Sequence, residues 1–231
     1  MSNAFVILSL IALMPITLWA QPKILVAKPT TQLKGLVIIA PAKKYLMEER
    51  LFSELSRQLS HRGFIVVRFN WSEDTLLDPN LELQRAARDI YKVVSESQRY
   101  FRIGSSSTVL ISKSFSTKSL GLSLNLAMNH ILLTPNCSKE STFASTYGSI
   151  LKRPDLKMSI VISNEDPNCY VKQIYSALGQ LANPISLFTT HGDHNFVTSQ
   201  TQAFGKFSPF IYQDQVVQFV TIQALVNLIV K

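Results

Sequence analysis

The stretch at residues 108–124, T-V-L-I-S-K-S-F-S-T-K-S-L-G-L-S-L, decides how the rest of the chain is interpreted. Its first four residues are β-branched or apolar and predict a buried strand. Small polar residues follow abruptly, and an apolar pattern with helical spacing begins at Leu120 and continues through Leu124 and Ala127. We therefore predict a strand, a sharp turn with Ser114 at its corner, and a helix.

The turn has the context of a nucleophile elbow, in which a serine is raised clear of its neighbours at the end of a strand. The usual pattern is G-x-S-x-G, whereas this turn reads Ser112-Lys113-Ser114-Phe115-Ser116 and has serine at both glycine positions. Glycine is usual because the turn is strained and side chains there crowd the neighbouring strand and helix. Ser112 and Ser116 therefore require some local relaxation.

The chain has 231 residues, of which 46% are hydrophobic, and this suits one α/β domain with a substantial core. Residues 1–20 contain no Lys, Arg, Asp or Glu and end in Leu-Trp-Ala, which predicts a secretory signal peptide cleaved after Ala20. Residues 21–231 would then form the domain. An uncleaved membrane anchor is the alternative, but the apolar run is short for a span of about 20 residues, and Pro15 interrupts it.

The formal net charge is +8 at pH 7, and every charged residue follows residue 20. The basic residues are scattered, and no basic run carries aromatic side chains at a regular spacing. We therefore expect no nucleic-acid partner. We expect an exported protein, periplasmic or secreted, with no stable membrane span after signal removal; its oligomeric state cannot be read from the sequence.

Strands and helices are predicted to alternate along the chain. Apolar runs predict strands at 23–26, 35–40, 64–69, 108–111, 130–134, 158–163 and 185–189. Apolar positions with helical spacing predict helices at 48–60, 81–99, 170–181 and 213–231. This alternation predicts an α/β fold in one domain, with a mainly parallel sheet covered by helices on both faces.

Residues that follow the strands are candidates for a site, because ligands bind at the carboxyl ends of strands in an open parallel sheet. Ser114, Asp166 and His194 each follow a predicted strand, in that chain order. A serine, an acid and a histidine are therefore expected at the same edge of the sheet. His61 and His130 precede strands and should lie at the opposite edge.

These segments resemble the α/β-hydrolase superfamily, in particular its small dienelactone-hydrolase-like branch. The matching pieces are G-L-V-I-I-A-P-A, F-I-V-V-R-F-N-W, S-K-S-F-S-T-K, I-L-L-T-P, I-V-I-S-N-E-D-P and G-D-H-N-F. The resemblance implies Ser114 as nucleophile, His194 as general base and then acid, and Asp166 as the residue that orients the imidazole. It also implies an oxyanion hole formed by the backbone N–H groups of Phe115 and Ala42.

The resemblance implies a serine hydrolase that acts without a cofactor on an ester, thioester or related acyl bond of a small substrate, through an acyl-enzyme. The alternative is a catalytically silent binding or scaffold protein of the cell envelope that kept this fold. This alternative arises from the loop that should supply the second oxyanion donor, where Ala40-Pro41-Ala42 replaces the usual His-Gly. Because proline has no N–H, only Ala42 or Lys43 can supply that donor. A third class is a membrane-anchored partner protein.

Other polar residues near the predicted site have alternative interpretations. Glu165 competes with Asp166 as the acid, but the resembling pattern places the acid directly before proline. His191, Asp193 and His194 could be interpreted as metal ligands, yet no other Cys-rich or His-rich group joins them, and a metal needs three or four convergent ligands. We therefore expect no metal.

Side chains around the elbow and after the histidine add two expectations. Lys113 and Lys118 flank the predicted nucleophile and are expected to be solvated surface lysines rather than a site for an anionic substrate. An aromatic group follows the histidine and would either roof an acyl pocket or pack onto the sheet; its members are Phe196, Phe204, Phe207, Phe210 and Tyr212.

Once this fold is assumed, Cys137 and Cys169 follow neighbouring strands and lie at the same edge of the sheet. In an exported protein this favours a disulfide. The bond would close a loop of about 30 residues and contribute roughly 3 to 4 kcal/mol to stability. It would also hold the loop that carries Asp166. The alternative is two free thiols in a reducing compartment.

Overall fold

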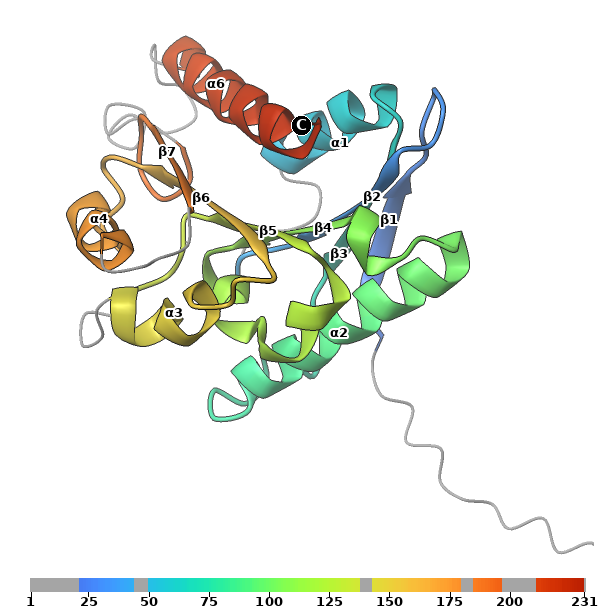
Figure 1. Ribbon diagram of the computed structural model, residues 1–231, viewed down its shortest axis with the longest axis horizontal. Helices are drawn as coiled ribbons and strands as arrows, with labels where there is room; N and C mark the ends of the chain where they lie inside the picture. Colours follow the sequence, from blue (N-terminus) through green and yellow to red (C-terminus); the bar gives the residue numbers. More distant parts are fainter. Residues whose placement is uncertain (1–20, 44–49, 138–142, 180–184, 197–210, 231) are drawn as a thin grey trace, which may run out of the picture.

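One seven-stranded sheet organises the computed structural model of the chain, which describes residues 21–43, 50–137, 143–179, 185–196 and 211–230. The predicted signal peptide at 1–20 lies outside these residues. The strands are β1 (Lys23–Ala27), β2 (Gly35–Ala40), β3 (Phe64–Asn70), β4 (Thr108–Lys113), β5 (Asn129–Leu133), β6 (Lys157–Ser163) and β7 (Ser186–Thr190). Their order in the sheet is β1-β3-β2-β4-β5-β6-β7 (Figure 1).

The sheet is mainly parallel, as the alternation of strands and helices predicts. Only β1, at the edge, pairs antiparallel with its neighbour β3 among the described strands. β2 is buried along its whole length because both of its faces are covered, which explains its continuous apolar sequence. Leu36 and Ile38 face one core and Val37 and Ile39 face the other.

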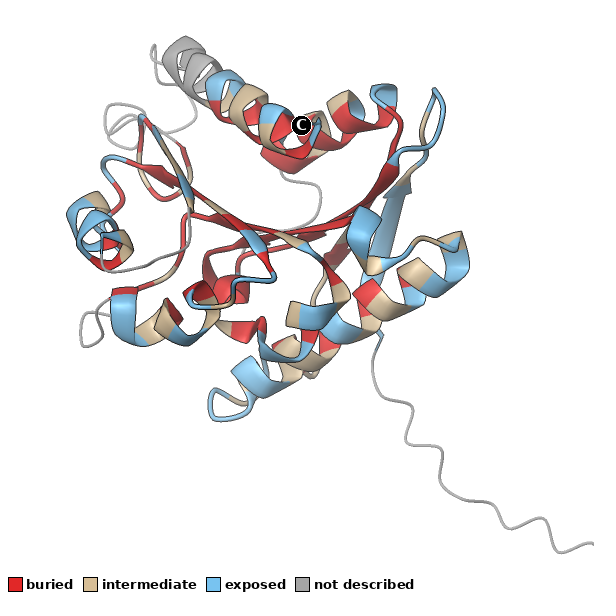
Figure 2. Cartoon of the chain, viewed as in Figure 1, coloured by how far each residue is buried: buried red, intermediate tan, exposed pale blue. Residues whose placement is uncertain are grey.

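Helices cover both faces of the sheet (Figures 1 and 2). They are α1 (Arg50–His61), α2 (Glu82–Phe101), α3 (Phe143–Leu151), α4 (Val171–Leu178) and α6 (Ile211–Val230). α1 and α6 pack on one face, and α2, α3 and α4 pack on the other. Figure 2 shows that the buried positions follow the sheet and the helix surfaces turned toward it. The predicted single-domain α/β fold is therefore confirmed.

The segment after the elbow differs from the prediction. Instead of an α-helix, two 3₁₀ helices follow β4, at Ser114–Ser119 and Gly121–Leu126. Leu120 and Ala127 are buried as the apolar pattern predicts. The backbone is tighter because the many serine and threonine hydroxyls of this segment compete for backbone hydrogen bonds, and Gly121 weakens a regular α-helix.

α6 packs against α1 and the sheet through Ile222, Leu225 and Val226, which confirms its interpretation as a core helix. Within the described ranges, no helix combines the length and the apolar character needed to cross a membrane.

The carboxyl ends of β2 and β4 form the point from which the site is built. β2 lies between β3 and β4, and Ala40 of β2 is in register with Ser112 of β4. α1 packs on one face of the sheet and α2 on the other. The connections after β2 and β3 therefore leave toward opposite faces, and in open α/β sheets ligands bind near the carboxyl ends of strands where the connections diverge in this way. Ala42 and Ser114 both lie two residues beyond the Ala40–Ser112 pair.

Candidate active site

Ser114 occupies a strained turn directly after β4. Its φ is 51°, in the left-handed region that residues with a side chain adopt rarely. Such strain is characteristic of a nucleophile elbow and persists only where the surroundings hold it. The turn therefore has the geometry of an elbow although its two glycines are replaced.

The two replacing serines are accommodated in different ways. The Ser116 hydroxyl lies 2.9 Å from the carbonyl oxygen of Lys113 and 3.1 Å from that of Ala40, so it can donate to either. It thereby connects the elbow to the end of β2. The Ser112 hydroxyl is buried and has no hydrogen-bond partner within the described part of the chain. One serine therefore supports the turn, whereas the other is merely tolerated there.

The structure brings Ser114, His194 and Asp166 together from three separate strand ends. The Ser114 hydroxyl lies 2.6 Å from Nε2 of His194, and Nδ1 of the same ring lies 2.8 Å from Oδ2 of Asp166. With the ring proton on Nδ1, the serine donates to Nε2 and the imidazole donates to the carboxylate. The exposed fractions are 8% for Ser114, 9% for His194 and 2% for Asp166, so the contacts are largely shielded from water.

The carboxylate belongs to Asp166 and not to its neighbour Glu165, which is exposed. Oδ1 of Asp166 also accepts a hydrogen bond of 2.8 Å from the backbone N–H of Asn168, which fixes the carboxylate plane. The predicted disulfide between Cys137 and Cys169 is present and joins this loop to the segment that follows β5.

The loop that carries His194 is hydrogen-bonded to the end of β6 and the residues after it. Three bonds make this connection: Asn164 N–H to the Thr190 carbonyl (2.8 Å), Glu165 N–H to the Gly192 carbonyl (3.2 Å), and the Ser163 hydroxyl to the Asp193 carbonyl (2.5 Å). Phe196, at the end of the loop, is completely buried in the core beneath α1 and α6. The imidazole is therefore held by its loop as well as by its own contacts.

Lys113 is not the solvated surface lysine that the sequence led us to expect. It is 0% exposed, and its Nζ donates a 3.2 Å hydrogen bond to Oδ1 of Asn195. The residue before Ser114 is thus bonded to the residue after His194. Lys118 is half-buried.

The proposed oxyanion donors lie at the ends of adjacent strands. Ala42 follows β2 and Phe115 follows Ser114 after β4, and both are buried. Phe115 is the second residue of a 3₁₀ helix, and the first N–H groups of a helix have no partner within it. Its N–H group therefore has no partner within this helix.

The carbonyl of Ser114 is held by hydroxyl groups that the sequence did not single out. Thr117 donates to this carbonyl, and its hydroxyl oxygen lies 2.6 Å from the Tyr147 hydroxyl of α3. The Tyr147 hydroxyl also lies 2.9 Å from the carbonyl of Asn136, so its one proton can be donated to either Thr117 or Asn136. Burial raises the pKa of the Tyr147 phenol, so it stays protonated as this network requires.

The sequence singles out two further groups near this centre, a possible set of metal ligands and a set of aromatic side chains. His191 is exposed, and no group of three or more His, Cys, Asp or Glu side chains within the described ranges is placed to hold a metal ion. Phe204, Phe207, Phe210 and the side chain of Tyr212 fall outside the residues that the structure describes.

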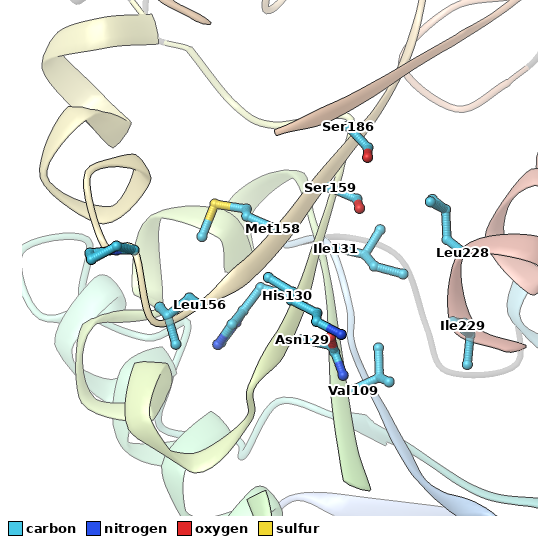
Figure 3. A pocket seen from close by; sticks show the side chains of 12 residues that line it. Val109, Asn129, His130, Ile131, Leu156, Met158, Ser159, Ser186, Leu228 and Ile229 are labelled. Atoms are coloured by element: carbon cyan, nitrogen blue, oxygen red, sulfur yellow. The ribbon is translucent and has the colours of Figure 1, made fainter. Parts of the chain in front are cut away.

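A cavity of about 590 Å³ lies at the opposite edge of the sheet (Figure 3). Its lining includes Asn129 and Lys157, which begin β5 and β6, together with Leu228 and Ile229 of α6. His130, the second residue of β5, also lines the cavity and lies at this opposite edge as expected. This cavity is therefore remote from the strand ends that carry Ser114.

Several solved structures share this fold. An α/β serine hydrolase homologue from Coxiella burnetii aligns with a TM-score of 0.64 at 16% identity, over 89% of this chain and 92% of its own. Est1E from Butyrivibrio proteoclasticus with bound ferulic acid gives 0.63 at 12% identity, over 91% and 96%. A serine hydrolase without a lid from Xanthomonas campestris gives 0.60 at 17% identity, over 75% and 80%.

Neither the protein-family models nor the curated protein sequences contain a match to this chain. At such low identities, the likeness to solved structures establishes the fold alone. It is the fold that the sequence resemblance predicts.

Proposed function

We propose that this chain, which has the α/β-hydrolase fold, is a serine hydrolase that cleaves an ester, thioester or related acyl bond of a small substrate. The observation that carries the proposal is the pair of contacts of His194, 2.6 Å to the Ser114 hydroxyl and 2.8 Å to the Asp166 carboxylate. A hydroxyl, a base and an orienting acid within hydrogen-bond reach are what nucleophilic acyl transfer needs.

In the acylation step, Ser114 Oγ attacks the carbonyl carbon of the substrate while Nε2 of His194 takes its proton. The carbonyl oxygen becomes an oxyanion and accepts hydrogen bonds from the N–H groups of Phe115 and Ala42. The imidazolium then gives its proton to the leaving group as the bond to that group breaks. An acyl ester of Ser114 remains.

In the deacylation step, a water molecule gives a proton to Nε2 of His194 and attacks the acyl carbon. The imidazolium returns this proton to Ser114 Oγ as the ester bond breaks, and the carboxylic acid leaves. Asp166 keeps the second ring proton on Nδ1 throughout. Because this carboxylate is buried, it stabilises the imidazolium more than an exposed one would.

Export forms part of the proposal. The Cys137–Cys169 disulfide supports it, because disulfides persist in oxidising compartments such as the periplasm and the extracellular space. The uncharged apolar sequence at 1–20 supports it as well.

One observation favours the alternative of a silent binding or scaffold protein. Pro41 occupies the oxyanion loop and cannot donate a hydrogen bond, so the hole depends on Ala42 or Lys43 for its second donor. Such a protein would keep the contacts of His194 and lack turnover.

Hydrolysis of p-nitrophenyl acetate and butyrate tests the proposal. Ser114→Ala should lower kcat by roughly a thousandfold or more, and Asp166→Asn by roughly a hundredfold or more, with little change in KM. Glu165→Gln is the matched control, because it alters the exposed neighbouring carboxylate, and it should keep wild-type rates. Absence of wild-type turnover, or equal losses in Glu165→Gln and Asp166→Asn, would contradict the proposal.

A further inference from the structure

One aromatic side chain contacts both of the residues proposed as oxyanion donors. Trp71 directly follows β3, at the same edge of the sheet as Ser114. Its indole N–H donates a 3.2 Å hydrogen bond to the carbonyl of Ala42. Its ring meets the Phe115 ring edge-to-face, with centroids 5.6 Å apart and planes at 89°.

We propose that Trp71 is a positioning residue of the oxyanion hole, which holds the Ala42 loop and the Phe115 turn at a fixed separation. This inference rests on the proposed function, because it assigns a role within the same site. The contacts that carry this role are with Ala42 and Phe115 rather than with Ser114. Trp71 acts through the two residues whose backbone N–H groups receive the oxyanion.

The loop after β2 needs such a support. Pro41 removes one backbone donor from it, so the loop has fewer ways to be held by its own hydrogen bonds. β2 lies between β3 and β4, and the indole reaches over its end from the β3 side. The bond to the carbonyl of Ala42 fixes the Ala42–Lys43 peptide plane, which carries the N–H of Lys43, and it limits rotation of the backbone next to the N–H of Ala42. An oxyanion hole is effective only when its donors are fixed in advance.

Trp71 is itself held in place from two directions. Its ring meets the Phe69 ring edge-to-face at 5.3 Å. The next residue, Ser72, donates to Oδ2 of Asp89 from its N–H (3.0 Å) and from its hydroxyl (2.6 Å). The hydroxyl of Thr75 donates to the same oxygen over 2.6 Å, and Asp89 of α2 is only 1% exposed. A buried carboxylate with this many donors is a rigid anchor.

Lys43, the next residue of this loop, has its own attachments to the same elements. The Lys43 ammonium is paired with Glu82, the first residue of α2, and lies 5.8 Å from the centre of the Phe115 ring. Both Trp71 and Lys43 thus connect the loop after β2 to Phe115. Of the two, only Trp71 bonds to the backbone of Ala42, so we assign the positioning role to it.

The test compares Trp71→Phe and Trp71→Leu with the wild type on p-nitrophenyl acetate and on a trifluoromethyl ketone. The ketone forms a tetrahedral adduct whose oxyanion occupies the hole, so its inhibition constant measures the hole directly. Trp71→Phe keeps an aromatic ring and loses the N–H donor, whereas Trp71→Leu also loses the ring contact. Tyr100→Phe is the control, because Tyr100 is exposed near the end of α2, away from the elbow.

We expect Trp71→Phe to lower kcat roughly tenfold with KM unchanged, and to raise the ketone inhibition constant by the same factor. Trp71→Leu should show a larger loss, and Tyr100→Phe none. Phe115→Leu, which leaves the bond from Trp71 to Ala42 intact, should show a smaller loss than Trp71→Leu.

Two results would overturn the inference in distinguishable ways. An active wild type with unchanged kcat and ketone inhibition in Trp71→Phe removes the positioning role and leaves the hydrolase proposal intact. A higher KM with an unchanged kcat in Trp71→Phe would also remove the positioning role, because it would indicate that Trp71 binds the substrate as part of the pocket wall. A wild type that neither turns over esters nor binds the ketone removes both proposals together.

Discussion

Nζ of Lys113 donates a hydrogen bond to Oδ1 of Asn195 over 3.2 Å, and each of these residues adjoins a member of the proposed triad. Lys113 precedes Ser114, and Asn195 follows His194. Two adjacent contacts therefore join the elbow to the histidine loop, one of them the 2.6 Å contact between Ser114 and His194. Because the ammonium is buried, water does not readily replace a lost partner.

Asn195→Ala should therefore loosen the histidine loop. We expect the free energy of unfolding to fall by about 1 to 3 kcal/mol and kcat to fall roughly tenfold with KM little changed. Asn195→Asp keeps an oxygen acceptor at this position and should recover most of the activity. Denaturant unfolding and ester hydrolysis measure the two effects, and equal kcat values for Asn195→Ala and the wild type would exclude a positioning role.

The two serines that replace the elbow glycines form a matched pair for mutation. Ser116→Ala removes a hydroxyl that bonds to the carbonyls of Lys113 and Ala40, and should lower the free energy of unfolding by about 1 kcal/mol. Ser112→Ala removes a buried hydroxyl without a partner in the described residues, and should leave stability unchanged or raise it. Urea unfolding of both variants checks the difference, and a reversed order would contradict this account of the turn.

The disulfide should couple stability to the site. Replacing Cys137 and Cys169 together by alanine removes a cross-link between positions separated by 32 residues. We expect a loss of about 3 to 4 kcal/mol in the free energy of unfolding. Because the cross-link holds the loop of Asp166, the variant should also have a lower kcat than the wild type, even at temperatures well below its own unfolding temperature. A lower stability with an unchanged kcat would show that the disulfide stabilises the fold without affecting the site.

His130 should make the fold sensitive to mild acid. Burial lowers the pKa of His130, although Nε2 lies 2.9 Å from the Ala127 carbonyl and 3.1 Å from that of Leu124, contacts that favour the charged form. The unfolded chain therefore binds a proton below about pH 6.5 that the folded chain does not. The stability that the neutral, buried His130 contributes is therefore complete above about pH 6.5. It is lost progressively as the pH falls from there toward the lower pKa of His130 in the folded chain.

Denaturant unfolding at about pH 7.5 and pH 5.5 measures this effect. The wild type should lose more stability over this interval than His130→Gln, because the variant lacks the buried imidazole. Equal losses in the two proteins would show that His130 does not titrate with folding.

Much of the fold could be predicted because its sheet is simple. The run G-L-V-I-I-A reads directly as a strand buried on both faces, and that is β2. Asp166 and His194 could be placed near Ser114 because each follows a parallel strand, and parallel strands end at one edge. Side-chain geometry follows from such chain order only when the residues beyond the strands are well held, as residues 164–170 after β6 and residues 191–196 after β7 are.

Other parts of the site depend on contacts between residues distant in the sequence. Lys113 is interpreted as solvated from its residue type, since lysine is rarely fully buried, and no local pattern indicates its bond to Asn195. Trp71 lies within the quoted segment F-I-V-V-R-F-N-W, yet no local pattern indicates its bond to Ala42. The partnership of Thr117 with Tyr147 has the same origin, because α3 reaches the elbow only in the folded chain.

The most direct measurement of the central claim is labelling of the native protein with a fluorophosphonate, followed by mass spectrometry of the labelled peptide. Because the reagent reacts with a serine activated by a neighbouring base, we predict a single adduct on Ser114 in the wild type. His194→Ala should label far more slowly, and Ser114→Ala should not label at all. An unlabelled wild type, or an adduct that persists in Ser114→Ala, would contradict the claim that Ser114 is the nucleophile.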